Sequence, residues 1–326
     1  MRALRLHDRL VAAALPKLAG QIDIIHAWPS GALETLRVAR SLGIATVLER
    51  PNAHTRFAYE VVREESERLG LSLPPGHEHA YNPEVLRREE QEYALADKLL
   101  CPSDFVVKTF RDEGFASERL VRTLYGFEDG VFHPPEEPRR RDRGLTVLFV
   151  GVCAVRKGVH YGLEAWLRSP ASRTGTFLIA GEFLPDYADR LSGMLAHPSV
   201  QVLGHRTDVP ELLRRSDALV LPSIEEGSAL VCGEAVASGC VPLVSEASSA
   251  VCQHGENSLV HRVGDVDELA GHFTALHEDR QLLEQLRDGC LRTAPDYTWA
   301  KAGARLVEVY EEVVAGKAGK AVSRAA

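Results

Sequence analysis

The sequence has no run of 18 apolar residues, so it contains no segment of the length and composition that crosses a bilayer. Acidic residues outnumber basic ones and the net charge is −8, which argues against a nucleic-acid-binding protein with a dominant basic surface. None of the six cysteines belongs to a Cys-x-x-Cys pair. That absence argues against a zinc framework or a disulfide scaffold, and it predicts reduced thiols in a cytoplasmic protein.

The first 17 residues contain an apolar patch that charged residues interrupt. This pattern favours an amphipathic helix over a signal peptide, and it leaves open a peripheral contact with a membrane. The composition, 45% hydrophobic and 26% charged, is that of an ordinary globular protein. A length of 326 residues predicts two domains. The boundaries we expect are residues 1–134 for the first domain, 135–144 for a proline-rich charged linker, 145–298 for the second domain and 299–326 for a terminal helix and tail.

Strand-like and helix-like segments alternate in the first half. Residues 22–27 and 45–49 are expected to be strands, with a helix over 31–42 between them, which predicts βαβ units and a parallel sheet. Ligands of such sheets bind at the carboxyl ends of the strands. The polar side chains that follow these two strands are therefore candidates for a site: His26, Trp28, Ser30, Glu49, Arg50, Asn52 and His54.

The second half has the same rhythm. Short apolar runs rich in β-branched residues predict strands over 145–150, 218–221 and 241–245. Residues 176–182 and 200–206 are each expected to hold a strand and the turn that follows it. Helical patterns lie between them, so this half is expected to be a doubly wound α/β domain.

One stretch in this half combines a strand, a tight turn and a helix. After the strand 218–221 come Pro222 and Ser223, then Glu226 and Gly227, and a helical pattern that ends near Gly239. We expect Ser228 to cap this helix, and the N–H groups of Ser228, Ala229 and Leu230 to form an anion site. Glu234 follows Glu226 by eight positions, a little over two helical turns.

The Glu-x7-Glu spacing after a Pro-Ser turn resembles the signature of retaining glycosyltransferases of the GT-B fold, family 4. The resemblance implies two Rossmann-like domains that face a cleft, and transfer of a sugar from a UDP- or GDP-sugar with retention of configuration. It implies that Glu226 meets the donor sugar and that Glu234 holds the ribose. No cofactor is expected, and no catalytic metal, because we identify no Asp-x-Asp metal motif. The resemblance further implies that the leaving diphosphate accepts the proton of the acceptor.

Other segments fit the same resemblance. The loop from Gly151 to Gly158 carries Arg156 and Lys157 before a helix, and adjacent cations suit a diphosphate. The family usually has an arginine directly after the first glycine, where this chain has Val152; we expect Arg156 to replace that charge. The resemblance further implies that His54 faces the sugar-phosphate, and that His205 and Arg206 lie near the nucleotide base.

Two departures leave alternatives open. The family's opening strand and glycine-rich turn have no counterpart, so the first domain is expected to be incomplete, either by nature or through a misplaced start. A non-catalytic relative that binds a nucleotide or scaffolds a partner is the second hypothesis, and a nucleotide-sugar epimerase is a weaker third. The acceptor, a glycan, a lipid or a small molecule, is not specified by the sequence. We expect the His77-Glu78-His79 segment to be a solvated loop and not a metal site.

Overall fold

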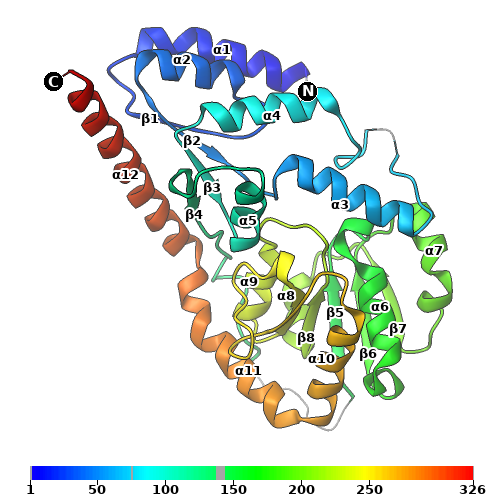
Figure 1. Ribbon diagram of the computed structural model, residues 1–326. Helices are drawn as coiled ribbons and strands as arrows, with labels where there is room; N and C mark the ends of the chain where they lie inside the picture. The colour runs from blue at the N-terminus through cyan, green and yellow to red at the C-terminus, as the bar shows by residue number, and fades with distance from the viewer. Residues whose placement is uncertain (1, 75, 137–143, 326) are drawn as a thin grey trace.

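The computed structural model describes residues 2–74, 76–136 and 144–325, and it contains two parallel β-sheets, one in each half of the chain (Figure 1). Most of the predicted 135–144 linker, residues 137–143, lies outside the described residues. In the part of the chain that is described, no helix has the length and hydrophobicity needed to span a bilayer.

The first sheet has four parallel strands in the order β1-β2-β3-β4. Helices α2, α4 and α5 pack on one face of it through an apolar cluster that includes Leu36, Tyr93 and Phe110. Helix α12 covers the other face with Val309 and Val313. The elements of this half are α1 (Arg2–Leu18), β1 (Ile24–Ala27), α2 (Leu33–Leu42), β2 (Ala45–Glu49), α3 (Thr55–Arg68), α4 (Pro83–Leu95), β3 (Lys98–Cys101), α5 (Asp104–Asp112), η1 (Ser117–Arg119) and β4 (Leu120–Arg122).

The second sheet has six parallel strands in the order β10-β9-β8-β5-β6-β7, so the strand order reverses between β8 and β5. Ligands of doubly wound sheets bind at such a reversal. The elements are β5 (Thr146–Val150), η2 (Val155–Lys157), α6 (Val159–Arg168), η3 (Pro170–Arg173), β6 (Thr176–Ala180), α7 (Pro185–Leu195), β7 (Val200–Gly204), α8 (Val209–Arg215), β8 (Ala218–Leu221), α9 (Leu230–Ala237), β9 (Val241–Ser245), η4 (Glu246–Ser248), β10 (Leu259–His261), α10 (Val266–Glu278), α11 (Arg280–Thr293), η5 (Ala294–Tyr297) and α12 (Trp299–Ala325).

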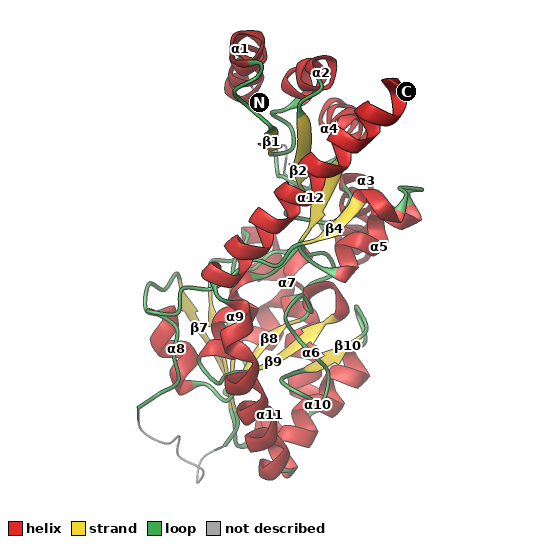
Figure 2. Cartoon of the chain, turned by 90° about the vertical axis from the view of Figure 1, so that its left-hand side faces the viewer, coloured by secondary structure: helices red, strands yellow, loops and turns green. Residues whose placement is uncertain are grey.

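The terminal helix α12 joins the two halves. It starts beside the second half, where Phe127 pairs with Thr298, and it runs along the molecule to the first sheet (Figures 1 and 2). The sequence pattern predicted this helix to about residue 314 with a frayed tail, whereas the structure continues it to Ala325. Each buried valine on its apolar face is worth about 1.5–3 kcal/mol, so this contact helps to hold the halves together.

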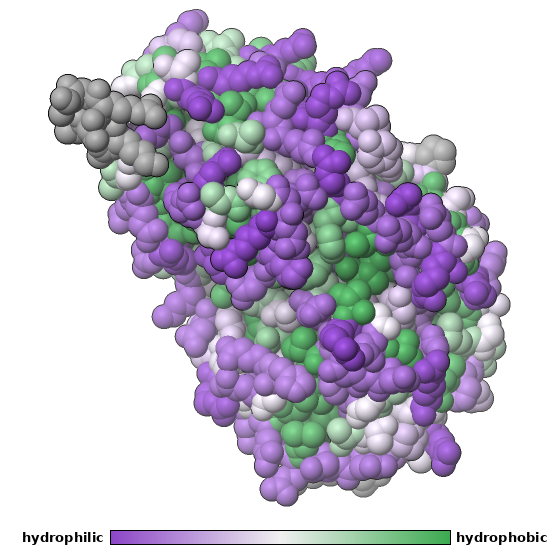
Figure 3. All heavy atoms as spheres, viewed as in Figure 1, coloured by the Kyte–Doolittle hydropathy of each residue, from purple (hydrophilic) through white to green (hydrophobic). Residues whose placement is uncertain are grey.

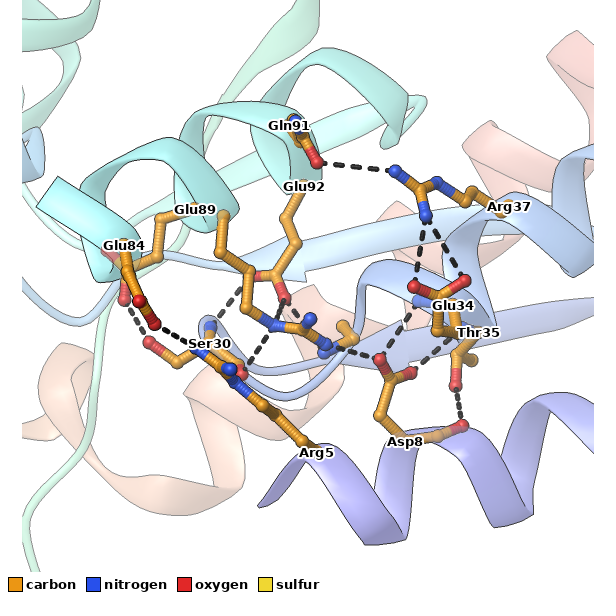
Figure 4. A network of polar contacts seen from close by, with 12 residues as sticks. Arg5, Asp8, Ser30, Glu34, Thr35, Arg37, Glu84, Glu89, Gln91 and Glu92 are labelled. Carbon is orange, nitrogen blue, oxygen red and sulfur yellow. Dashed lines mark hydrogen bonds and ion pairs between the residues drawn. The ribbon is translucent and has the colours of Figure 1, made fainter. Parts of the chain in front are cut away.

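Helices α1 and α4 fix the start of α2 (Figure 4). The carboxylate of Asp8 accepts hydrogen bonds from the N–H groups of Glu34 and Thr35 at 2.9 and 2.8 Å, and Glu92 accepts one from Ala32 at 3.0 Å. The N-cap residue of α2 makes no side-chain cap of its own. Carboxylates from two other helices therefore satisfy N–H groups that would otherwise be left unpaired.

A hollow of about 720 Å³ lies between the halves, bordered by α3 and α5 above and by Tyr161 of α6 below. Figure 3 shows apolar surface in this region between the two halves. Ile224, directly before the Glu225-Glu226 pair, is part of its lining. The turn after β8 therefore lies at the boundary between the halves, where the carboxyl ends of the two sheets meet.

Candidate functional site

The turn between β8 and α9 is buried. β8 is inaccessible on both faces, as expected for a central parallel strand, and the side chains of Glu225 and Glu226 that follow it are 0% and 7% exposed. The predicted cap is wrong: α9 begins at Leu230, its N-cap is Ala229, and no side chain caps it. The N–H groups of its first turn therefore lack the Ser228 hydroxyl as a partner, and their partial positive charge is directed toward the turn.

Two cations from the loop after β5 contact Glu226. Arg156 donates a hydrogen bond to Glu226 Oε1 at 3.0 Å, and Lys157 forms an ion pair with Oε2. Burial alone would raise the pKa of the Glu226 carboxyl, but Lys157 and Arg156 outweigh it and lower the pKa to about 2. The structure thus brings Arg156 and Lys157, which we expect to bind a diphosphate, into contact with Glu226, which we expect to meet the donor sugar.

Glycines allow the backbone to pack closely here. A Cβ on Gly227 would lie 1.5 Å from the carbonyl oxygen of Pro51, so only glycine permits this approach of the turn to the first half. Gly151, at the start of the cationic loop, has a φ of 143° that favours glycine.

Glu234 differs from Glu226 in having no partner for its carboxylate among the residues that the structure describes. It lies on α9, one residue after the buried Gly233, and it is only partly exposed. Burial raises the pKa of the Glu234 carboxyl to about 7. A half-buried carboxylate without a partner is costly, and it is suited to accept hydrogen bonds from a ligand.

His54 does not have the exposure that a contact with a donor requires. Its side chain caps α3 by accepting a hydrogen bond from Arg56 N–H, and its ring packs against Tyr93, Phe110 and Phe115. The residue is 1% exposed, and burial together with Arg50 and Arg56 lowers its pKa to about 4. In this structure His54 is a neutral cap inside the first half, and its predicted catalytic role stays a prediction.

His205 and Arg206 lie in an exposed turn after β7, at one edge of the second sheet. Arg206 is bound to Asp208 by hydrogen bonds of 2.8 and 2.6 Å. Among the residues that the structure describes, no hydrogen bond or ion pair links this turn to Glu226 or Glu234, so its role toward a base stays a prediction.

Sequence analysis missed two residues of the site. The sequence pattern gives Glu225 no role and predicts a solvated loop for His79. In the structure the two residues are 0% and 5% exposed, and Glu225 Oε2 lies 3.3 Å from His79 Nε2. No local pattern could have shown this contact, because the two residues are 146 positions apart in the chain.

Acidic residues elsewhere have structural partners. The expectation that the chain lacks an Asp-x-Asp motif is wrong, because Asp265 and Asp267 form one at the start of α10. Asp265 caps this helix, and Asp267 pairs with Arg168. Throughout the described ranges, no group of three or more histidine, cysteine, aspartate or glutamate side chains is arranged to hold a metal ion.

Comparison with known proteins agrees with this geometry. Residues 144–279 match the family model described as glycosyl transferases group 1. Over these residues, less than half of the chain, the protein is similar to group 1 glycosyltransferases. The matched segment contains Arg156, Lys157, Glu226 and Glu234, the four charged residues described above.

Curated relatives extend the similarity. The chain is 26% identical to D-inositol 3-phosphate glycosyltransferase 1 of Catenulispora acidiphila, over 94% of this chain and 76% of that protein. It is 31% identical to a glycogen synthase of Mycobacterium tuberculosis, over 56% of this chain and 46% of the relative. These shares mean that the chain spans about half of the second relative and three-quarters of the first.

Solved structures show that the fold is GT-B. HepE of Anabaena, in complex with UDP, superposes with a TM-score of 0.70 at 18% identity, covering 93% of this chain and 82% of HepE. Sucrose-phosphate synthase from Thermosynechococcus elongatus gives a TM-score of 0.71 at 18% identity, over 96% of this chain and 79% of the enzyme.

Proposed function

We propose that the protein transfers a sugar from a nucleoside diphosphate sugar to an acceptor, with retention of anomeric configuration. The observation that carries the proposal is that one turn brings together two cations and two carboxylates, of which one is paired with the cations and the other is not. Arg156 and Lys157 are held beside Glu226, and Glu234 on the following helix has a carboxylate without a partner among the described residues.

Each part then has a separate task. The two cations, with the N–H groups at the start of α9, bind the leaving diphosphate, where negative charge grows in the transition state. Glu226 contacts the donor sugar once the diphosphate takes over its cations, and Glu234 accepts hydrogen bonds from the ribose hydroxyls. The diphosphate accepts the acceptor's proton on the same face, so no protein nucleophile is needed.

A donor panel tests the proposal. The full chain is incubated with UDP-, GDP- and ADP-sugars and with glycan, lipid and small-molecule acceptors, and products are identified by mass spectrometry. The anomeric proton of the product, read by NMR, reports the configuration. An inverted product would contradict the retaining assignment.

One observation favours the alternative, a relative that binds a nucleotide without transfer. Val152 is 59% exposed in the cationic loop, where the resembled family has an arginine. The missing guanidinium removes a bidentate donor for phosphate. This alternative would be supported if the protein bound a nucleoside diphosphate tightly but released no nucleoside diphosphate from any of the donor sugars.

Lys157→Ala should weaken UDP binding by about 10- to 100-fold, because a hydrogen bond to a charged group is worth about 1.5–3 kcal/mol. Uridine lacks the diphosphate, so its binding should not change. Calorimetry with both ligands checks this, and Lys301→Ala, at an exposed lysine on α12, is the control. Equal losses for uridine and UDP would remove Lys157 from the diphosphate site.

We infer that α1 makes the peripheral membrane contact. Its outer face exposes Leu6 and Leu10, at 60% and 63%, beside the exposed cations Arg2 and Arg9, and its single acidic residue, Asp8, is buried. Such a face suits an anionic bilayer. Leu6→Ser with Leu10→Ser should reduce co-sedimentation with phosphatidylglycerol vesicles at least tenfold. Equal sedimentation of the parent with phosphatidylcholine vesicles would contradict the role of charge.

A further inference from the structure

Glu225 links the two halves of the molecule through both oxygens of its carboxylate. Oε1 accepts a hydrogen bond from Ala53 N–H at 3.0 Å, in the loop after β2 of the first half. Oε2 lies 3.3 Å from His79 Nε2, also in the first half, and 3.4 Å from Arg156 Nη1. The side chain is fully buried, so water does not compete for these contacts.

The same residue holds the guanidinium of Arg156 independently of Glu226. Arg156 Nη1 donates to the backbone oxygen of Glu225 at 3.1 Å and also contacts the Glu225 carboxylate. When a diphosphate displaces Glu226 from Arg156, the two contacts to Glu225 can remain. Arg156 would then stay at the turn instead of following the ligand.

Burial of Glu225 is compensated from both halves. Arg156 lies on the second-half side, and His79 on the first-half side. Burial disfavours charge on the His79 ring, but the contacts to Glu225 and Glu78 outweigh it, so the pKa of His79 is raised. His77 and Arg156 are the other titratable or charged groups near this ring. A buried carboxylate that lost either partner would be strongly destabilised.

We infer that Glu225 is a positioning residue for sugar transfer. It fixes the position of the first-half loop at Ala53 relative to the Arg156 guanidinium, at the boundary between the halves. The inference rests on the proposed function and adds a residue outside Glu-x7-Glu. Glu225 needs no contact with substrate. We place the acceptor in the first half, as the resemblance to GT-B enzymes implies. Glu225 acts because that half and the diphosphate-binding cation must be aligned when the reacting groups meet, and small displacements reduce the rate strongly.

Three full-length variants test the inference. Glu225→Gln keeps the size and an oxygen for Ala53 N–H but loses the charge, whereas Glu225→Ala loses every side-chain contact. Glu164→Gln, at an exposed glutamate paired with Arg168, is the matched control. Amide hydrogen exchange of the segments containing Ala53 and Arg156 is measured without any donor, and kcat and KM are measured with the donor that the parent uses.

We expect exchange at Ala53 to accelerate at least tenfold in Glu225→Ala and less in Glu225→Gln, with no change in the control. We expect kcat to fall at least tenfold in both variants while the donor KM changes less than threefold, since the residue aligns groups and does not bind the donor. Unchanged exchange at Ala53 in both variants would overturn the inference, as would parental kcat in Glu225→Ala. A parent that transfers no sugar would count against the proposed function alone, because exchange at Ala53 still decides whether Glu225 holds the boundary.

Discussion

Glu226→Gln should lower the rate of sugar transfer by about 10²- to 10³-fold, the loss found when one group that stabilises a transition state is removed. It should also tighten the binding of bare UDP. In the free protein Glu226 occupies Arg156 and Lys157, so a diphosphate must compete with it for both cations. Glutamine competes less, because it carries no charge.

The measurement combines a turnover assay with UDP titration by calorimetry. The control is Glu211→Gln, at an exposed glutamate on α8 that pairs with Arg214. If the Glu226 variant keeps parental turnover, the carboxylate has no part in transfer. If it binds UDP at least tenfold more weakly than the parent, Glu226 is needed to shape the diphosphate site and does not compete with the ligand.

The order of strands and helices in the second half could be predicted because its signals are local. Four apolar residues, a Pro-Ser turn and a glycine suffice to place Glu226 between β8 and α9, and the structure has this order. Elements with weak local signals were missed. β10, which was not predicted, has only three residues. No bounds were predicted for α7, which begins at Pro185 after an N-cap that makes no side-chain hydrogen bond.

The contacts at the boundary between the halves could not be predicted. Ala53 and Glu225 are 172 positions apart, and the burial of Glu225 depends on partners brought together only by the docking of two sheets. The same reason explains His54: its spacing after β2 fits an exposed ligand-facing residue, but Tyr93 and Phe110, from α4 and α5, enclose it. Sequence patterns report the faces of single elements, whereas enclosure depends on several elements at once.

Glu234→Gln should weaken nucleotide binding and at the same time stabilise the free protein. At pH 8 the parental carboxylate is ionised and can accept charged hydrogen bonds from the ribose, each worth about 1.5–3 kcal/mol. The variant should therefore bind both uridine and UDP about 10- to 100-fold more weakly. Because the pKa of Glu234 is raised to about 7, parental affinity should also rise from pH 6 to pH 8, and the variant should lack this rise.

The stability of the free protein should change in the opposite sense. A carboxyl group whose folded-state pKa of about 7 lies above its ordinary value of 4.5 binds its proton more tightly in the folded state. Its favourable contribution is therefore complete below about pH 4.5, and the folded state loses it as the pH rises to 7. Glutamine does not ionise, so Glu234→Gln should be more stable than the parent by about 1–3 kcal/mol at pH 8 and nearly equal to it at pH 4. Urea unfolding at the two pH values, with Glu164→Gln as control, measures the difference. If the free energy of unfolding changed with pH equally in parent and variant, Glu234 would have the same pKa in the folded and unfolded states. That result would contradict the argument that Glu234 is a buried carboxylate without a partner that binds the ribose.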